Sequence, residues 1–435
     1  MLEVNYLDTS ELTTLRKTFK NCYNVTLINA TDWDTSKVTS LYEAFEDCNN
    51  LTSLDVSNWD TSNVTTMYET FHHCELLTSI DVSNFDTSNV TDMFCTFINC
   101  NSLTSLDLSN WDVSNVTNMN GMFNGCESLT SLDLSNFDTS NVTDMSYMFY
   151  DCNNLTNLDV NSWDVSKVIN VEHMFHNCIR LVSLDLSKWN TTNMLYMNCM
   201  FQNCDYLQTI GDVSNWNVSN VTTMQNMFDL CQSLTVLDLS NWDTNKVQNM
   251  GAMFGSCYAL TELKTDNWDT SNVTNTSWMF NRDFNLKSLD LSNWNTSKIT
   301  NMTWMFTDCT GLETLNLNGW NIKNAEYSNM FMPYEYTGCP NLNYISMNNS
   351  DYNSVNGIIE QLPTRNATDF GILDVLGADI IDQIDITTAR NKYWNVIAIH
   401  NAIKNIHIGD IPINTLFLQG DKKIKSIYFG DNKLY

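Results

Sequence analysis

The sequence is poor in positively charged side chains. Lys and Arg contribute 21 residues against 50 Asp and Glu, which gives a formal net charge of −29 at pH 7. A surface with this excess of carboxylates repels the phosphate backbone of nucleic acids and attracts cations. Nucleic acid is therefore not expected as a partner.

Several marks of enzymes and membrane proteins are also missing. The 14 glycines are scattered and form no P-loop or other glycine-rich phosphate turn. No set of residues presents a nucleophile, a general base and an orienting group together. No run approaches the roughly 18 apolar residues that span a bilayer, and the start, Met1 to Tyr6, lacks the basic segment and apolar run of a secretory signal. We therefore expect a non-enzymatic protein with no membrane span.

What the chain does have is a period. An aromatic side chain returns every 26 residues, and only the step from Trp189 to Trp216 is 27. Such self-similarity is typical of a solenoid, in which each repeat buries its apolar face against its neighbours. The series is Trp33, Trp59, Phe85, Trp111, Phe137, Trp163, Trp189, Trp216, Trp242, Trp268, Trp294 and Trp320.

Residues 51–76 illustrate one repeat. Leu54 and Val56 alternate with polar residues, the pattern of a short strand with one buried face. Asp60 opens a run of turn-forming and capping residue types. Apolar side chains then recur three or four positions apart, which predicts a short helix. These positions are Val64, Met67, Phe71 and Cys74. The sequence thus predicts an α/β repeat solenoid of about thirteen strand-turn-helix coils.

The cysteines follow the same period. A residue at the same place in each coil is most simply a small buried hydrophobe stacked in a column, with disulfides or metal binding as alternatives. Asp283 fills the one vacant rung, Cys95 and Cys199 lie off the column, and no CxxC pair occurs. Free thiols suit assembly in a reducing cytoplasm. The column consists of Cys22, Cys48, Cys74, Cys100, Cys126, Cys152, Cys178, Cys204, Cys231, Cys257, Cys309 and Cys339.

The best candidate for a binding surface is an acidic residue four positions before the aromatic, often followed two positions later by serine. Like charges about 5 Å apart repel, so solvent, neighbouring hydroxyls or bound cations have to compensate them. A solvated polar face, a ligand- or receptor-binding surface and a row of Ca²⁺ sites are the three interpretations. The candidate residues are Asp55, Asp81, Asp107, Asp133, Asp159, Asp185, Asp212, Asp238 and Asp290, with Ser57, Ser83, Ser109 and Ser135.

Three further sets receive structural interpretations. The aromatic column is expected in the core rather than as a platform for sugars. His72, His73, His173 and His176 lie near column cysteines, but neighbouring coils are not expected to supply the other ligands of a zinc site. A second acidic series at the turn is expected to cap it. That series is Asp34, Asp60, Asp86, Asp112, Asp138, Asp164, Asp243 and Asp269.

The pattern LxxLxLxxW…VxxMxxMFxxCxxL resembles the leucine-rich repeats of BspA-like bacterial surface proteins, in particular their 26-residue variety, over roughly residues 1–350. The resemblance implies strands on a concave face, helices on a convex face, and adhesion to host proteins, glycans or other cells. Two features depart from the family. No secretion signal or anchor is visible, and the solenoid starts at once with Leu2, Val4 and Leu7 in apolar repeat positions. An open first coil predicts either a partner chain or an upstream segment.

The C-terminal part loses the period. Residues 351–403 are expected to form irregular capping coils, with a helix end at 357–363, a strand at 371–375 and a helix at 389–394. Residues 404–435 hold three apolar runs that each end in Gly-Asp, a hairpin signal. This resembles the Gly-Asp hairpin modules of bacteriophage tail and baseplate proteins and predicts a small β-meander that docks or oligomerises. The runs are 406–410, 416–421 and 427–431.

These observations favour a receptor-binding or adhesion protein. The main interpretation is a bacteriophage virion component, from a tail, baseplate or fibre, that recognises a bacterial surface glycan or protein receptor. Recognition is expected through many weak polar contacts along the concave face. Other virion proteins are expected at the open first coil and the β-meander. The alternatives are a secreted BspA-like adhesin at the bacterial cell surface and a purely structural virion protein. No cofactor is expected, and Ca²⁺ at the acidic column is left open.

Overall fold

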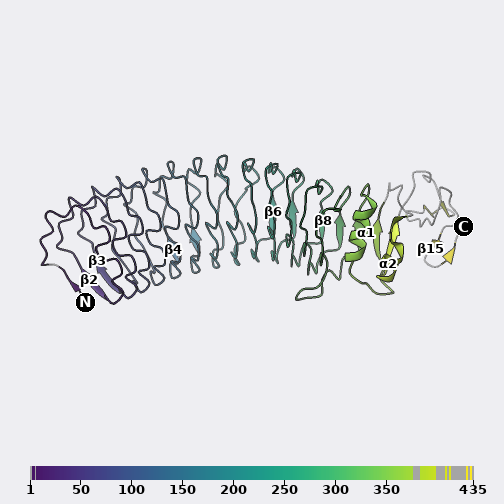
Figure 1. The fold of residues 1–435 in the computed structure, drawn as a ribbon, viewed down its shortest axis with the longest axis horizontal. Coiled ribbons are helices and arrows are strands. Elements are labelled where there is room, and N and C mark those ends of the chain that lie inside the picture. Colours follow the sequence, from purple (N-terminus) through teal and green to yellow (C-terminus); the bar gives the residue numbers. More distant parts are fainter. Residues whose placement is uncertain are drawn as a thin grey trace. The chain divides into compact units, whose positions relative to one another are not determined.

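The computed structural model describes residues 2–4, 6–375 and 383–397, together with the backbone of four two-residue strands between 407 and 433. The chain divides into two compact units, residues 1–242 and 243–435. Each unit is a solenoid of stacked coils (Figure 1), as the period predicts. Among the described residues, neither helix has the length and apolarity needed to cross a bilayer.

In the first unit the strands of successive coils pair in parallel with a constant register. Leu2 pairs with Ile28, and Ile28 pairs with Leu54, so each pairing joins residues 26 positions apart. The sequence period therefore equals one turn of the solenoid. The strands of this unit are β1 (Leu2–Glu3), β2 (Leu27–Asn29), β3 (Ser53–Asp55), β4 (Ser131–Leu132), β5 (Asn157–Leu158) and β6 (Val236–Asp238).

The second unit contains a five-stranded parallel sheet in the order β12-β11-β10-β9-β8. The sheet runs from the regular coils into the segment predicted to cap them. Its side chains alternate between buried and accessible positions, as in β8, where Leu289 is buried between two exposed residues. The strands of this unit within residues 243–397 are β7 (Glu262–Lys264), β8 (Ser288–Asp290), β9 (Thr314–Asn316), β10 (Tyr344–Ser346), β11 (Gly371–Asp374) and β12 (Trp394–Ile397).

The predicted helix of each coil is wrong. The backbone N–H groups of Met67, Glu69 and Phe71 donate to carbonyls of the next coil, at 3.0, 2.8 and 2.9 Å, instead of to carbonyls four residues earlier. Residues between them close tight turns, as where Thr70 N–H donates to the Met67 carbonyl. Glu69 has φ +50° and His73 has φ +57°, and the same two positions are left-handed in successive coils. Left-handed residues cannot continue a right-handed α-helix, so the coils are built from turns, with a short strand in some of them.

The predicted core is confirmed. Trp59 is buried and stacks on Trp33 with a ring-centroid separation of 6.3 Å, while its Nε1 donates to the Ala30 carbonyl at 3.0 Å. The column cysteines are free thiols, and all except Cys22, which is half-buried, are buried. Each typically donates to a phenylalanine carbonyl one coil earlier, as Cys126 Sγ does at 3.2 Å. The aromatic and cysteine columns therefore hold consecutive coils together.

Helices appear only after the repeat ends, within the described residues. Helix α1 (Tyr352–Gln361) begins at Asp351, whose carboxylate accepts N–H bonds from the first turn. This helix and β11 confirm the predicted helix end and strand. Helix α2 (Ile386–Asn391) starts earlier than expected, and Trp394 belongs to β12. The domain boundaries at 350 and 403 stay predictions.

Two of the three Gly-Asp runs contain the first strand of an antiparallel pair, as a hairpin signal predicts. Strand β13 (His407–Ile408) pairs with β14 (Ile411–Pro412), and β15 (Tyr428–Phe429) pairs with β16 (Asn432–Lys433). The run at 416–421 lies outside the described residues.

Candidate functional site

The acidic residues predicted as a binding surface share one local geometry. In the first coil of the series, Asp55 Oδ1 accepts hydrogen bonds from Ser57 N at 3.2 Å and Ser57 Oγ at 2.8 Å. This is an Asx turn, which ends the strand. Asp81, Asp107 and Asp133 make the same pair of bonds to Ser83, Ser109 and Ser135. The turn uses one carboxylate oxygen of each aspartate.

We call the members in the first unit the Asp ladder. They are Asp55, Asp81, Asp107, Asp133, Asp159, Asp185, Asp212 and Asp238. All are exposed except Asp238, which is half-buried. Asp290 has the same geometry in the second unit, where Oδ1 accepts from Ser292 N and Oγ at 3.0 and 2.6 Å. These residues are therefore accessible, and their role as a binding surface stays a prediction.

The Asx turn needs an oxygen acceptor and not a charge. At the equivalent position of β2, Asn29 Oδ1 accepts from Thr31 N at 3.2 Å and Thr31 Oγ1 at 2.9 Å. In β9, Asn316 Oδ1 accepts from the backbone of Asn318 at 3.2 Å. The protein itself thus folds this turn with asparagine. The negative charges of the Asp ladder are more than the local structure requires.

The same hydrogen bonds favour the ionised form in four members of the ladder. The Ser109 hydroxyl and backbone N–H lower the pKa of Asp107, and equivalent bonds lower the pKa of Asp133, Asp185 and Asp212. Donors to the charged form of a carboxyl group favour ionisation. Serine and backbone donors thus offset the mutual repulsion expected for stacked carboxylates.

The second acidic series caps turns, as predicted, although the turn is not followed by a helix. Asp60 Oδ1 accepts from Ser62 N at 3.0 Å and Ser62 Oγ at 2.6 Å. Asp34 and Asp86 repeat this geometry with serines two positions later.

A second accessible surface arises where a loop interrupts the repeat in the second unit. The buried carboxylate of Asp308 accepts backbone N–H bonds from Tyr334, Glu335, Tyr336 and Gly338, at 2.8–3.1 Å. This anchor leaves Tyr334 55% exposed and Tyr336 50% exposed. Tyrosines on a firmly held loop are typical of recognition surfaces. The sequence signal was the break in the period at 332–337.

The loop formed by residues 332–337, called the Tyr loop below, rests on side chains of the regular coils. Tyr334 stands edge-on to Trp278 and Trp304, with ring-centroid separations of 5.5 and 5.4 Å. Arg282 pairs with Glu335 at 2.7 Å and faces the Tyr334 ring. The loop is thus fixed by an ion pair, aromatic contacts and backbone hydrogen bonds.

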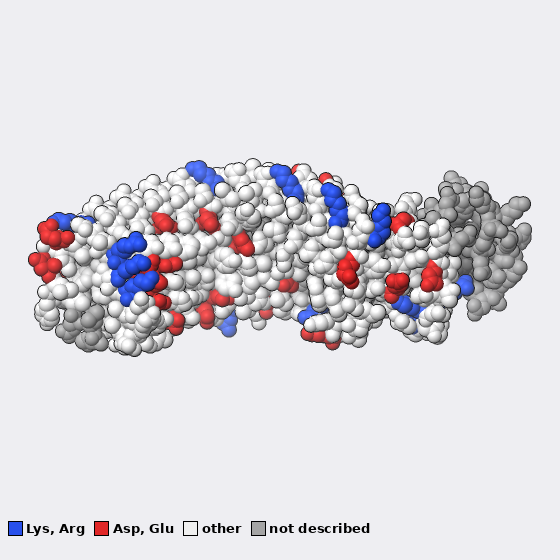
Figure 2. Space-filling model, in the orientation of Figure 1, with Lys and Arg blue, Asp and Glu red and all other residues white. Residues whose placement is uncertain are grey.

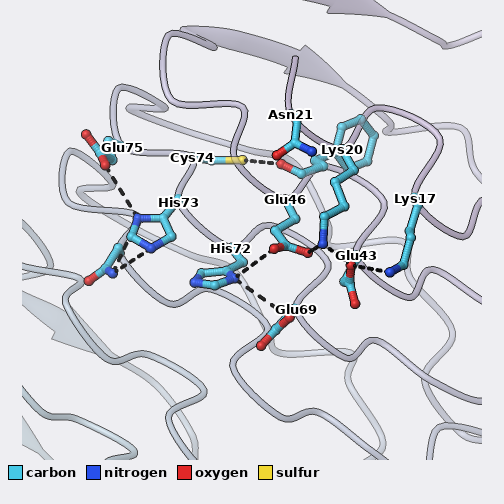
Figure 3. A network of polar contacts seen from close by, with 12 residues as sticks. Lys17, Lys20, Asn21, Glu43, Glu46, Glu69, His72, His73, Cys74 and Glu75 are labelled. Atoms are coloured by element: carbon cyan, nitrogen blue, oxygen red, sulfur yellow. Dashed lines mark hydrogen bonds and ion pairs between the residues drawn. The ribbon is translucent and has the colours of Figure 1, made fainter. Parts of the chain in front are cut away.

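A third feature is a cluster of charged residues in the N-terminal part of the first unit. Figure 2 shows Lys and Arg gathered beside Asp and Glu there, on a face that is otherwise mostly uncharged. Lys20 Nζ bonds to Glu46 at 2.6 Å and also to Glu43. Lys17 Nζ lies 3.0 Å from Glu43. Figure 3 shows that His72 points between Glu46 and Glu69.

The two halves of the cluster differ in their partners: lysines pair with Glu43 and Glu46, whereas no lysine or arginine pairs with Glu69 among the described residues. Burial acts against ionisation of Glu43, but hydrogen bonds from Lys20 and other neighbours outweigh it and lower the pKa to about 2. Burial, together with repulsion by Glu46 and Glu43, raises the pKa of Glu69 to about 7. Burial and the neighbouring His73 lower the pKa of His72 to about 4, so its imidazole is neutral at pH 7.

The expectation that neighbouring coils supply no further ligand beside His72 is wrong. Glu46, in the preceding coil, lies one period before His72, and Glu69 lies three residues before it. The signal was the register itself, since residues 26 apart are neighbours in the stack. The other pair, His173 and His176, bond to each other through Nδ1 at 2.9 Å; His173 stacks on Tyr147, and His176 lies tilted against Tyr150. In the part of the chain that the structure describes, no three-ligand set of His, Cys, Asp and Glu side chains includes them.

Comparisons with known proteins match the repeat region. The family model described as "Mycoplasma protein of unknown function, DUF285" matches residues 13–127, 67–183, 96–210, 177–264 and 258–368. No curated protein matches the chain significantly.

Several solved structures are similar to the chain. One is a leucine-rich repeat protein from Bacteroides ovatus, with 18% identity over 88% of this chain and 86% of that chain and a TM-score of 0.38. Another is a leucine rich cell surface protein from Faecalibacterium prausnitzii, with 18% identity over 76% of this chain and 81% of that chain and a TM-score of 0.40. The functional domain of InlJ from Listeria monocytogenes, which includes a cysteine ladder, has 15% identity over 85% of this chain and 81% of that chain and a TM-score of 0.22.

Proposed function

The chain belongs to the family described as Mycoplasma protein of unknown function, DUF285, and from this premise we propose that it is a non-enzymatic adhesion protein that binds a macromolecular partner at a cell surface. The observation that carries the proposal is the excess charge of the Asp ladder. Eight exposed or half-exposed carboxylates repeat coil by coil in the first unit, although asparagine forms the same turn.

A repeated surface of this kind suits multivalent recognition. Parallel strands lie about 4.8 Å apart, so the ladder offers a carboxylate and often a hydroxyl at that spacing. Each contact is weak because it is exposed and screened by salt. Many contacts made at once to one extended partner add up to useful affinity. The fitting partner is a protein or glycan with repeated cationic groups, or an anionic glycan bridged by Ca²⁺.

The test is binding of the fluorescently labelled full chain to bacterial cells of several species and to cultured animal cells. The matched variant replaces Asp55, Asp81, Asp107 and Asp133 by asparagine, which keeps the Asx turns and removes four charges. We expect selective binding that falls at least about tenfold in the variant, in line with four weak contacts. Loss in EDTA assigns the contacts to bridging cations, and loss only in high salt assigns them to cationic groups.

A second variant, Tyr334→Ser with Tyr336→Ser, separates the two surfaces. If only this variant loses binding, recognition lies on the loop and the ladder proposal fails. Binding to no cell type, or binding that neither variant changes, overturns the proposal as a whole.

A virion component remains the second candidate. Its support is limited to the antiparallel pairing of β13 with β14 and of β15 with β16, which is the type of pairing that a Gly-Asp hairpin signal predicts. Under this second proposal, other virion proteins bind at the first coil, where Leu7 is 58% exposed. Antibody labelling of intact phage particles and of intact cells distinguishes the two proposals. A virion component is labelled on phage particles, and an adhesion protein is labelled on cells.

A further inference from the structure

Three ligand-type atoms converge between two adjacent coils of the first unit. His72 Nδ1 lies 3.8 Å from Glu69 Oε2 and 3.9 Å from Glu46 Oε1, and one ligand-type atom from each of the three residues lies within 4.8 Å of the other two. Figure 3 shows the imidazole between the two carboxylates. Two ligands bound to one metal ion at about 2.0–2.2 Å are separated by roughly 3–4 Å. The spacing of these atoms is of that size.

The contacts within the cluster do not satisfy His72. Its Nδ1 is inaccessible to solvent and has no hydrogen-bond partner among the described residues. Distances of 3.8 and 3.9 Å are too long for hydrogen bonds. An inaccessible ring nitrogen without a partner costs free energy unless something else binds it. A neutral imidazole can offer this nitrogen to a metal ion as a lone-pair donor.

The ion pairs of the cluster also do not account for the burial of the Glu69 carboxylate. Lys17 and Lys20 pair with Glu43 and Glu46, whereas the only ion pair of Glu69 among the described residues is with His72. The Glu69 side chain is only 17% exposed. A mostly buried carboxylate beside two other carboxylates, with no lysine or arginine in direct ion-pair contact among the described residues, gains from the charge of a divalent cation.

The surrounding residues hold the three side chains in place. Lys20 bonds to Glu46 Oε2 at 2.6 Å, which leaves Oε1 on the His72 side. Glu69 has a left-handed backbone whose N–H is tied to the next coil by a bond to the Phe94 carbonyl at 2.8 Å. Fixed second-shell contacts of this kind orient ligands and raise metal affinity.

We propose that Glu46, Glu69 and His72 bind one divalent transition-metal ion of the zinc type, which ties two adjacent coils together. One imidazole nitrogen and two carboxylate oxygens suit Zn²⁺, Mn²⁺ or Co²⁺ better than Ca²⁺, which takes six to eight oxygen ligands. Water completes the coordination. The proposal does not depend on adhesion and concerns a different surface from the Asp ladder.

The experiment titrates the tag-free full chain with Co²⁺ and then displaces it with Zn²⁺, while the visible absorption of cobalt is recorded. The variants are Glu69→Gln and His72→Gln. The matched controls are His73→Gln and Glu75→Gln, because His73 lies 3.4 Å from Glu75 and is not part of the three-ligand set. Circular dichroism and tryptophan fluorescence confirm that each variant is folded.

We expect one equivalent of Co²⁺ bound through nitrogen and oxygen, without the charge-transfer band of thiolate ligands. Affinity falls at least about tenfold in both ligand variants and stays within about twofold in both controls. If His72→Gln does not fold, Glu69→Gln decides the matter, since it only removes a charge. No binding by the wild type, a thiolate band, or equal losses in ligand and control variants overturns the proposal.

Discussion

Ala252 and Ala259 lie in the same coil, and we expect glycine at these two positions to change stability in opposite directions. Ala252 has φ +51°, whereas the φ of Ala259 lies outside the left-handed region. Both side chains are half-buried. They differ mainly in backbone conformation, which makes Ala259→Gly a matched control for Ala252→Gly.

The magnitudes follow from the backbone. A left-handed alanine costs about 1–2 kcal/mol, which glycine removes. Glycine also gives the unfolded chain more freedom, at a cost of about 0.4–1 kcal/mol, and the lost methyl group removes a few tenths more. Ala252→Gly is therefore expected to stabilise by about 0.5 kcal/mol. Ala259→Gly has only the costs and is expected to destabilise by about 1 kcal/mol.

The assay is urea unfolding of the full chain followed by tryptophan fluorescence, together with hydrogen exchange of peptides that cover residues 250–260. Exchange reports the stability of this coil separately, because repeat arrays do not always unfold as one unit. If both variants lose about 1 kcal/mol, as glycine does in a helix, the coil is helical and the turn structure is refuted.

Three further predictions follow from the core and the charged cluster. Replacing Trp111 by Phe removes the indole bond to the Val82 carbonyl and part of the ring, and should cost about 2 kcal/mol; a urea midpoint unchanged from wild type contradicts this. Of the 14 cysteines, all but Cys22 are buried. The native chain should therefore expose about one thiol to a disulfide reagent, and the denatured chain should expose all of them. Fast reaction of several thiols in the native state argues against the buried cysteine column. In EDTA, the contribution of Glu69 to the free energy of unfolding should fall as pH rises from 4.5 to about 7. The reason is that the pKa of Glu69 in the folded state is raised to about 7, so the folded state holds the Glu69 proton more tightly than the unfolded state does. The free energy of unfolding of Glu69→Gln should therefore gain about 1–3 kcal/mol over that of the wild type between pH 5 and pH 8. The contribution of His72, whose pKa is lowered to about 4, rises with pH from about 4 to 6.5 in both proteins and therefore cancels in the difference between them. A difference that stays constant across this range contradicts the raised pKa of Glu69.

Tertiary contacts between coils, and not the local sequence, decide whether each coil forms a helix or a series of turns. Val64, Met67, Phe71 and Cys74 are spaced three or four apart, and both a helix and a series of tight turns place such residues on one buried side. The choice depends on whether amides such as Phe71 N–H bond within the coil or to the next one. Only a neighbouring coil in the correct register can offer those carbonyls.

Part of the proposed metal site could also be predicted from the sequence. Glu46 and His72 are one period apart, so their proximity follows from the stacking. Lys20 occupies one oxygen of Glu46, and His72 Nδ1 has no partner among the described residues; both facts depend on rotamers and on the left-handed backbone at Glu69. No residue pattern encodes those features directly.

The sequence by itself determined the solenoid, the buried aromatic and cysteine columns, and the accessible Asp ladder. It did so because stacking in one dimension makes residues 26 apart into neighbours, so a period read along the chain is also a map of contacts. The tertiary structure alone decided the hydrogen bonding of the turns, the anchoring of the Tyr loop by Asp308 and the convergence of Glu46, Glu69 and His72. These depend on which groups remain unpaired once neighbouring coils have met, and that balance exists only in the folded stack.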